Sequence, residues 1–392
     1  MPGYPTGDGA PPPVPGRASV VPVGASVVPG GASAVPAVPP VVPGSAIGIV
    51  ANPMSGRDIR RLVARASVFP NAEKTNMALR LIAAAGALGV ERVYMSTDEM
   101  GVAGGVLRAA GKRRARDGRW PELDFCALDR PSGDAEDTRE LVRAMRGRGV
   151  AAVVLLGGDG TVRAAAAESA DVPLLPLSTG TNNAFPEMWE ATVAGSAAAL
   201  LATGQVTPDE ATYRAKALRV HCGSATEIAL VDVCVCTVAH VGARALWEVG
   251  TLRELYCAFA EPHAIGLSSI AGLVAPTGRG DRDGVALRLA GDAAAPRRVL
   301  APVAPGVLAS VGVLDVAPLR AGEPMTSAVP RGTVAVDGER ELEFGPNTPV
   351  TVTLTPHGPT VLDVRAALAR AAERGLLVSG NQEPVTTFQE VR

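Results

Sequence analysis

Apolar runs that end abruptly at glycines, prolines or hydroxyl side chains divide the first half of this chain. Residues 153–156 form one uninterrupted run, followed by Gly157-Gly158-Asp159-Gly160-Thr161. A run without polar alternation is typical of a strand covered on both faces, as in a parallel sheet between helices. The Ala-rich residues 162–169 favour a helix directly after the turn. The pattern therefore predicts a buried strand, a glycine-rich turn and a helix in succession.

Two further apolar runs end in polar turns of the same kind, at residues 52–56 and 178–183. Because parallel strands bring their carboxyl ends to one edge of the sheet, we expect the three turns to meet there. Gly157, Gly158 and Gly160 allow backbone angles closed to other residues, and peptide N–H groups can then approach a phosphate. The N-terminus of the following helix attracts the same group. An ordinary tight turn is the alternative interpretation of this segment taken alone.

Alternating strands and helices continue to about residue 205, where the pattern changes. Strands are predicted at residues 91–95 and 123–128, and helices at 102–116 and 135–148, which indicates a doubly wound parallel sheet. Later β-branched segments are short and separated by Gly, Pro and Asp turns, as in an antiparallel sandwich-like domain. These segments are residues 217–221, 226–238, 306–316, 333–336 and 350–354, with one helix expected at 246–258.

The two ends of the chain differ from its interior. Residues 1–44 hold 12 of the 33 prolines and 8 glycines, and residues 19–39 repeat every seven residues, so we expect a disordered tail without helix or strand. Val364, Leu368 and Ala371 form an apolar stripe before Gly375, which predicts an amphipathic helix. The expected domains are 45–205 and 206–358, with a return segment at 359–378 and a loose C-terminus at 379–392.

Composition narrows the possible functions. The formal net charge is −2, which provides no basic surface of the kind that nucleic-acid binding needs. No apolar run is long enough to span a membrane, and the five cysteines form no Cys-x-x-Cys pair, so we expect buried, reduced thiols in the cytoplasm. Neither a Walker P-loop nor a strand-linked Gly-x-Gly-x-x-Gly fingerprint occurs, which leaves phosphate binding to residues 157–161. No direct metal ligands are predicted.

Three motifs together, Asn-Pro-x-Ser-Gly, Gly-Gly-Asp-Gly-Thr and Thr-Gly-Thr-Asn-Asn, resemble those of the NAD kinase and diacylglycerol kinase superfamily. The chain is most similar to the branch called acetoin catabolism protein X, over residues 45–378. The resemblance implies a doubly wound α/β nucleotide-binding domain, a β-sandwich-like domain, a C-terminal helix that returns to the first domain, and an active site between the domains. It also implies a cytoplasmic kinase that uses ATP and Mg²⁺ to phosphorylate a hydroxyl group, nominally converting NAD to NADP. A homo-oligomer is compatible with it.

The resemblance assigns roles to individual residues. Asp159 would hold a magnesium-bound phosphate through water or accept the proton of the attacking hydroxyl, and Glu339 matches the proposed base of the lipid kinases. Asp232 and Asp337 would contact the substrate, although Asp337-Gly338 is equally well explained as a plain hairpin turn. A turn with Pro53 and a helix cap are the structural alternatives for Asn52 and Thr161. The predicted nucleotide-binding residues are Asn52, Ser55, Gly56, Gly157, Gly158, Gly160, Thr161, Thr179, Gly180, Thr181, Asn182 and Asn183.

Two departures from the NAD kinase pattern leave the phosphoryl acceptor open. Val231-Asp232 stands where NAD kinases carry Asn-Glu, and their Gly-Ser-Thr-Ala-Tyr segment has no clear equivalent, residues 266–272 being the nearest. One alternative is a kinase of the same fold that acts on a different small hydroxyl compound or a lipid head group. Another is a nucleotide-binding regulator of acetoin catabolism without kinase activity. In each case the expected partner is a small molecule.

Overall fold

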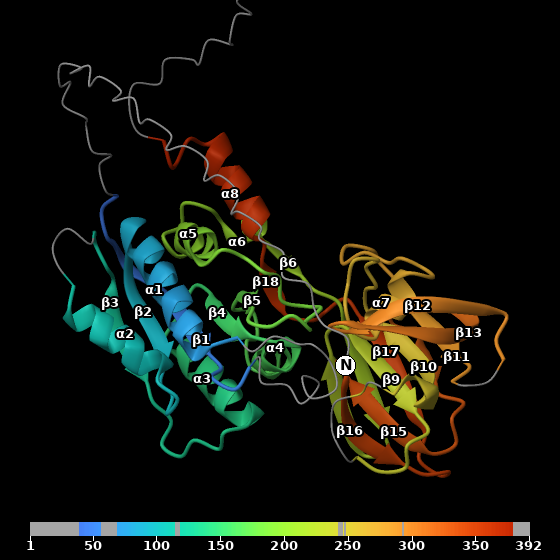
Figure 1. Ribbon diagram of the computed structural model, residues 1–392. Coiled ribbons are helices and arrows are strands. Elements are labelled where there is room, and N and C mark those ends of the chain that lie inside the picture. Colours follow the sequence, from blue (N-terminus) through green and yellow to red (C-terminus); the bar gives the residue numbers. More distant parts are fainter. Residues whose placement is uncertain are drawn as a thin grey trace, which may run out of the picture. The chain divides into compact units, whose positions relative to one another are not determined.

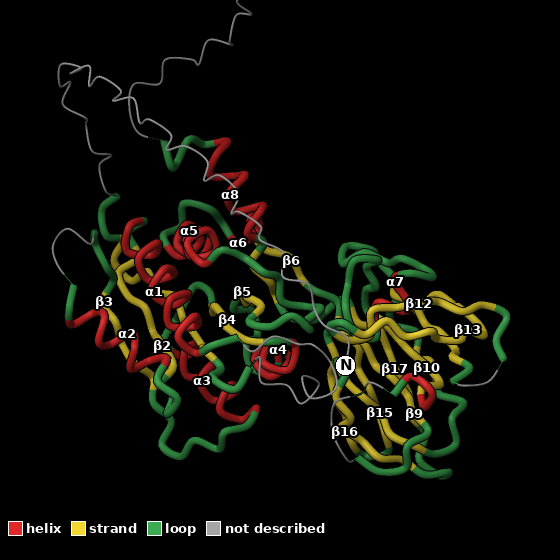
Figure 2. The backbone as a smooth tube through the Cα atoms, viewed as in Figure 1, coloured by secondary structure: helices red, strands yellow, loops and turns green. Residues whose placement is uncertain are grey.

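A computed structural model describes residues 39–55, 69–113, 118–241, 246, 248–291 and 294–378 of the chain. Within these residues an α/β lobe with a parallel sheet is followed by a lobe of antiparallel sheets, and a helix lies near the end (Figures 1 and 2). This is the fold class predicted from the alternation of apolar runs. The predicted Gly56 and the tail up to residue 38 lie outside the described residues.

The α/β lobe is built on a sheet of seven described strands in the order β3-β2-β1-β4-β5-β18-β6. Neighbours pair in parallel except at the β18–β6 edge. The order reverses between β1 and β4, so their carboxyl ends frame the switch point of a doubly wound sheet. The strands are β1 (Val42–Ala51), β2 (Val90–Ser96), β3 (Glu122–Cys126), β4 (Val153–Gly157), β5 (Leu174–Ser178), β6 (Thr212–Arg214) and β18 (Thr360–Leu362).

Helices cover both faces of this sheet, as the apolar run of β4 predicts. Val153 and Leu155 belong to one hydrophobic cluster and Val154 and Leu156 to another, because successive strand residues point to opposite faces. The first cluster includes side chains of α3 and α4, and the second those of α1 and α5. The helices of the lobe are α1 (Asn71–Ala87), α2 (Val102–Gly111), α3 (Ala135–Gly147), α4 (Asp159–Ala166), α5 (Ala191–Ala202), α6 (Pro208–Ala211) and α8 (Val364–Glu373).

The β-rich lobe contains two antiparallel sheets in the described part of the chain. Their strand orders are β12-β13-β11-β10-β9-β15-β16 and β14-β17-β7-β8, and α7 (Ser268–Gly272) packs on the larger sheet. All five cysteines are buried, as predicted. The strands are β7 (Ala217–Cys222), β8 (Ala225–Ala229), β9 (Asp232–Cys236), β10 (Leu252–Cys257), β11 (Gly284–Leu289), β12 (Arg297–Ala304), β13 (Val307–Leu319), β14 (Pro324–Thr326), β15 (Gly332–Val336), β16 (Glu339–Phe344) and β17 (Val350–Thr355).

Two predictions for this lobe are wrong. The helix expected at residues 246–258 is a short 3₁₀ turn at Val249–Thr251 followed by strand β10. Both flanks of β10 are paired, with β9 and β11, and this ladder outweighs the local helix preference of the segment. The single strand expected at 226–238 is divided into β8 and β9, which belong to different sheets. The division falls at Leu230 and Val231, whose N–H groups donate to the Asp337 carboxylate.

The ends of the described chain both join the α/β lobe. Strand β1 begins at Val42, three residues inside the segment predicted as a tail, and Val42 N–H donates to the carbonyl of Gly89. Near the other end, β18 adds to β5 in parallel, and Val364, Ala367 and Ala371 of α8 are buried in the cluster shared with α1 and α5. The predicted return of the C-terminal helix to the first domain is confirmed.

Candidate functional site

The three predicted turns meet at the carboxyl ends of β1, β4 and β5. The Asn52 amide donates to the Thr161 hydroxyl at 2.9 Å, and the Ser55 and Thr179 hydroxyls are 2.8 Å apart. These pairs are separated by 109 and 124 residues in sequence, yet the strand order places them at the switch point of the sheet. Thr161 and Thr179 are buried, so their hydroxyls lie inside the protein at this edge of the sheet.

Close packing, and not the backbone angle, requires glycine at positions 157 and 158 of the central turn. None of Gly157, Gly158 and Gly160 is among the described glycines with positive φ, which corrects the expectation of special angles. A Cβ at Gly157 would lie 2.5 Å from the Thr161 Cβ, and one at Gly158 would lie 2.6 Å from the Asn183 Oδ1. Helix α4 also begins earlier than predicted, at Asp159, with Gly158 as its N-cap. A Cβ at Gly160 would meet nothing within 4 Å, so the first turn of α4 is sterically open there.

Asp159 connects the start of α4 to the third turn. Its carboxylate accepts hydrogen bonds from the N–H groups of Ala184, at 3.1 and 3.2 Å, and Phe185, at 2.8 Å. The carbonyls of the same two residues accept from the Arg279 guanidinium at 2.6 and 2.9 Å. Arg279 lies 4.3 Å from the ring centroid of Phe259 and is paired with Glu261. The segment after the third turn is therefore held from both sides, by a carboxylate of the α/β lobe and a guanidinium of the β-rich lobe.

The third turn itself is held by internal hydrogen bonds. The Asn183 amide donates to the Ser178 hydroxyl at 2.8 Å, and that hydroxyl donates to the Gly180 carbonyl at 3.0 Å. Thr181 is exposed. The Asn182 Oδ1 is buried and has no hydrogen-bond partner within the described part of the chain, an arrangement that calls for a donor from outside.

Lys74 is a member of this site that sequence reasoning missed. Its side chain is fully buried in α1, and its ammonium donates to the carbonyls of Asn52, Pro53 and Ser55 at 2.9, 3.3 and 2.8 Å, and to the Asn71 amide oxygen at 3.2 Å. These bonds turn three carbonyls of the first turn inward. The sequence contained one indication that Lys74 is buried. It has the spacing of an apolar stripe with residues 77, 78, 81 and 82, which form the buried face of α1.

A small cavity of about 20 Å³ lies beside the central turn. Asp159, Asp232 and Asp337 line it together with Asn182 and Ala184. Four of the predicted residues from distant parts of the sequence, Asn182 included, thus share one cavity. The described residues contain no group of three or more His, Cys, Asp or Glu side chains arranged to hold a metal ion. None of the described helices is long and apolar enough to cross a membrane.

Asp337-Gly338 forms the two-residue hairpin between β15 and β16 that was the structural alternative for this motif. Both residues have positive φ, 49° and 77°, as a type I′ turn requires. The Asp337 carboxylate accepts hydrogen bonds from the N–H groups of Leu230, Val231 and Asp232. Burial raises the pKa of this carboxyl, against the opposing effect of Arg163 and these N–H donors. The hydrogen bonds to the Asp337 carboxylate fix the main chain between β8 and β9.

Arg163, one turn after Asp159 on α4, joins the two lobes electrostatically. It lies 2.8 Å from Glu341, 3.7 Å from Glu227 and 3.8 Å from Asp337, with only 15% of its side chain exposed. Burial by itself lowers the pKa of the guanidinium, but the carboxylates of Asp337 and Glu341 outweigh it and raise that pKa. Glu339 starts β16, is half-buried, and does not line the small cavity.

Comparisons with known proteins identify the family of this chain. Residues 47–206 match the family model for the ATP-NAD kinase N-terminal domain, and residues 216–357 match that for the acetoin catabolism protein X C-terminal domain. The chain is 43% identical over 339 residues to acetoin catabolism protein X of Cupriavidus necator, covering 85% of this chain and 94% of the relative. A crystal structure of yeast NADH kinase complexed with NADH aligns over 89% of this chain and 91% of its own, with 13% identity and a TM-score of 0.44. The two family domains in this order, and the identity over most of both chains, show that this chain belongs to the acetoin catabolism protein X family.

Proposed function

We propose that this protein is an ATP-dependent phosphotransferase that transfers the γ-phosphoryl group of ATP to a hydroxyl group of a small molecule. The convergence of the three turns at the strand-order switch carries the proposal. Amide, hydroxyl and main-chain N–H donors are concentrated there, and the N-terminus of α4 adds a partial positive charge. Phosphoryl transfer needs this combination, because its catalysis consists mainly of positioning and charge neutralisation.

The central turn suits the phosphates of a nucleotide. The first N–H groups of a helix have no intrahelical acceptor, and the open position at Gly160 gives a phosphate access to them. Asn52, Ser55 and the third turn supply further donors from both sides. Mg²⁺ carried by the nucleotide would neutralise phosphate charge, and holding its water ligands is the alternative role for the Asp159 carboxylate.

We assign the acceptor hydroxyl to the cavity beside Asp159. This carboxylate borders both the central turn and the cavity, and the N–H groups of Ala184 and Phe185 fix its orientation. It therefore takes the role of general base toward the hydroxyl. Asp232 contributes a second carboxylate to the cavity wall, whereas Asp337 positions the main chain around it. Glu339 is the base in the competing, lipid-kinase-like assignment.

One observation favours a second candidate, a nucleotide-binding regulator without transfer activity. Asp159 and Asp337 both accept main-chain hydrogen bonds, so two of the three carboxylates at the cavity hold segments of the protein itself.

The identity of the phosphoryl acceptor is open, since Val231 stands where the resemblance to NAD kinases places an amide. Sugars, polyols and lipid head groups therefore follow NAD among the compounds to test.

Purified protein with ATP, Mg²⁺ and NAD, assayed for NADP and ADP, tests the transfer activity. Asp159→Asn should lower the rate more than tenfold, about 1.4 kcal/mol of activation free energy, and leave ATP affinity unchanged. Gly158→Val should remove ATP binding itself because of the contact with Asn183. Asp129→Asn, at an exposed position, is the matched control. ATP binding without turnover of any acceptor would refute the kinase and leave the regulator, and a protein that does not bind ATP would refute both.

A further inference from the structure

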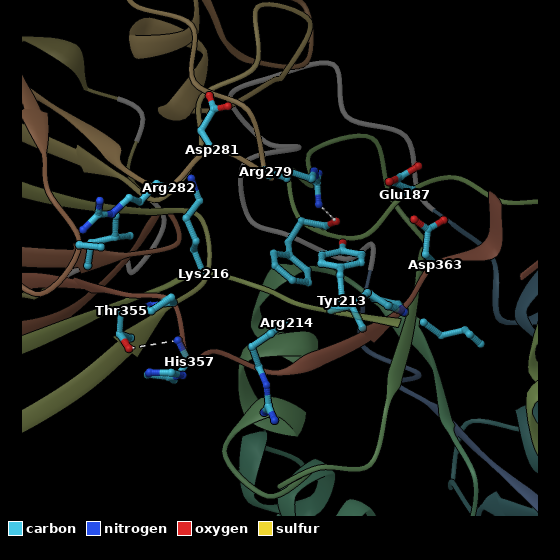
Figure 3. Close-up of a pocket in the computed structure, with 18 of the residues that line it drawn as sticks. Glu187, Tyr213, Arg214, Lys216, Arg279, Asp281, Arg282, Thr355, His357 and Asp363 are labelled. Atoms are coloured by element: carbon cyan, nitrogen blue, oxygen red, sulfur yellow. Dashed lines mark hydrogen bonds between the residues drawn. The ribbon is translucent and has the colours of Figure 1, made fainter. Parts of the chain in front are cut away.

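A second, much larger cavity of about 1300 Å³ lies between the two lobes (Figure 3). Strands β5, β6 and β18 line it from the α/β lobe, and β7, β17 and the loop before β11 line it from the β-rich lobe. The described residues around it include none of the predicted nucleotide-binding residues. Its volume exceeds the range of about 300–1,000 Å³ that is usual for small-molecule sites, so it has room for a complete metabolite.

The wall of this cavity is basic although the whole chain has a net charge of −2. Six lining residues carry a positive charge and three carry a negative charge, with His221 and His357 in addition. The cations come from both lobes: Figure 3 shows Arg214, which lies on β6, and Arg279 and Arg282, which share the loop before β11. A cleft lined mainly by one sign of charge raises the local concentration of ligands of the opposite sign.

Three of these cations, Lys216, Arg219 and Arg282, have no carboxylate partner among the described residues. Arg214 is paired with Asp171, and Arg365 with Glu187. For Arg219 and Arg282, no carboxylate lies within ion-pair distance in the described portion of the chain. A guanidinium without a carboxylate partner keeps its donors available for the paired hydrogen bonds that bind a phosphate.

The remaining wall supplies hydroxyl groups and aromatic rings. Arg219 on β7 is in register with Thr353 on β17, which places a guanidinium beside a hydroxyl on one sheet face. Lys216 is almost fully buried and donates to the carbonyls of Gly278 and Asp283, so it fixes the loop that carries Arg282. Trp189 and Tyr213 line the cavity from the α/β lobe.

We propose that this cavity is a second ligand site, which binds a small molecule with a phosphate group and an aromatic portion. Arg219 and Arg282, with the hydroxyl of Thr353, bind the phosphate, because guanidinium groups match the oxygens of a phosphate with paired hydrogen bonds. Trp189 and Tyr213 pack against the apolar portion. This binding does not depend on the proposed function.

Arg279 connects the second site to the first. It lines the large cavity and also holds the carbonyls of Ala184 and Phe185, whose N–H groups donate to Asp159. A ligand in the large cavity therefore acts on the segment that orients Asp159. The expected consequence, which rests on the proposed function, is that the ligand changes the affinity for ATP.

Calorimetry with phenyl phosphate and with inorganic phosphate tests the site. Each ligand should bind the wild type and Gly158→Val with the same Kd, because the variant blocks only the first site. Phenyl phosphate should bind more tightly than inorganic phosphate. Arg219→Gln combined with Arg282→Gln should weaken both at least tenfold. Arg108→Gln combined with Arg331→Gln removes the same charge at exposed positions and should change nothing. Trp189→Ala should weaken phenyl phosphate alone. Circular dichroism and thermal unfolding confirm that each variant is folded.

Several outcomes would overturn the proposal. Absence of binding to the folded wild type at millimolar phenyl phosphate would refute the second site. Binding that Gly158→Val removes and the double arginine variant retains would place the phosphate at the first site instead. If phenyl phosphate binds as expected but leaves the Kd for ATP unchanged, the coupling through Arg279 is refuted and the second site stands.

Discussion

Replacement of Lys74 by methionine tests whether a buried charge holds the first turn in its phosphate-binding form. The ammonium is fully buried and donates to three main-chain carbonyls and the Asn71 amide oxygen. Methionine has a similar length and no donor, so the variant keeps the packing of α1 and loses all four hydrogen bonds.

Two effects of this substitution oppose each other. Each acceptor left without a partner costs about 1–3 kcal/mol when it is buried. Removal of the charge stabilises the fold, because the desolvation penalty of a buried ammonium ion, several kcal/mol, is no longer present. Because residues 52, 53 and 55 are only half-buried, water can reach part of the turn and reduce the first cost. We expect a net loss of about 2 kcal/mol, or a decrease in Tm of a few degrees.

The substitution should also weaken ligand binding. Without the inward pull on the carbonyls of Asn52 and Ser55, the turn no longer presents its donors in one arrangement, and the Kd for ATP should rise about tenfold, equivalent to about 1.4 kcal/mol. Urea unfolding and calorimetry with ATP measure the two quantities. Lys112→Met removes an exposed lysine at the end of α2 and serves as the control. A Lys74→Met protein with wild-type stability and wild-type Kd would refute this reasoning.

Three further predictions concern the base, the N-terminal strand and the contact between α6 and α8. Glu339→Gln should keep turnover within about threefold of the wild type, because Glu339 does not line the small cavity, whereas a loss of two to four orders of magnitude would transfer the role of base to it. A protein lacking residues 1–44 should melt at a lower temperature than one lacking residues 1–38, because Val42 donates to Gly89 and Arg119 donates to the Pro39 carbonyl; equal melting temperatures would contradict this. The Thr207 N–H donates to Glu210 and Arg374 pairs with it, which lowers the pKa of Glu210 below 4.5. Its contribution to stability is therefore present above pH 4.5 and lost as the pH falls through the lowered pKa. Glu210→Gln should melt below the wild type at pH 7 and approach it as Glu210 of the wild type becomes protonated at acidic pH. A difference in Tm that does not depend on pH would show that the charge of Glu210 is irrelevant.

The sequence by itself determined the local parts of this protein. The unbroken apolar run of β4 predicted a strand buried on both faces, and the polar residues after β1, β4 and β5 marked three turns at one edge. The helix predicted at residues 135–148 is α3, whose acidic start and basic end suit the helix dipole. Such features depend on residues close in sequence, whose periodicity and turn preferences act within one element.

The tertiary structure decided which individual residues contact one another. The sequence predicted that the three turns meet at one edge, but the pairing of Asn52 with Thr161 depends on the switch between β1 and β4 and could not be derived from either segment alone. In the folded protein Lys74 is buried and donates to the first turn, and residues 252–257 form a strand. The Asp337 carboxylate accepts hydrogen bonds from main-chain N–H groups. The large basic cavity likewise combines residues of both lobes. In each case the deciding interaction lies between segments separated by tens of residues or more, and its partner is set by burial and hydrogen bonding in the complete fold.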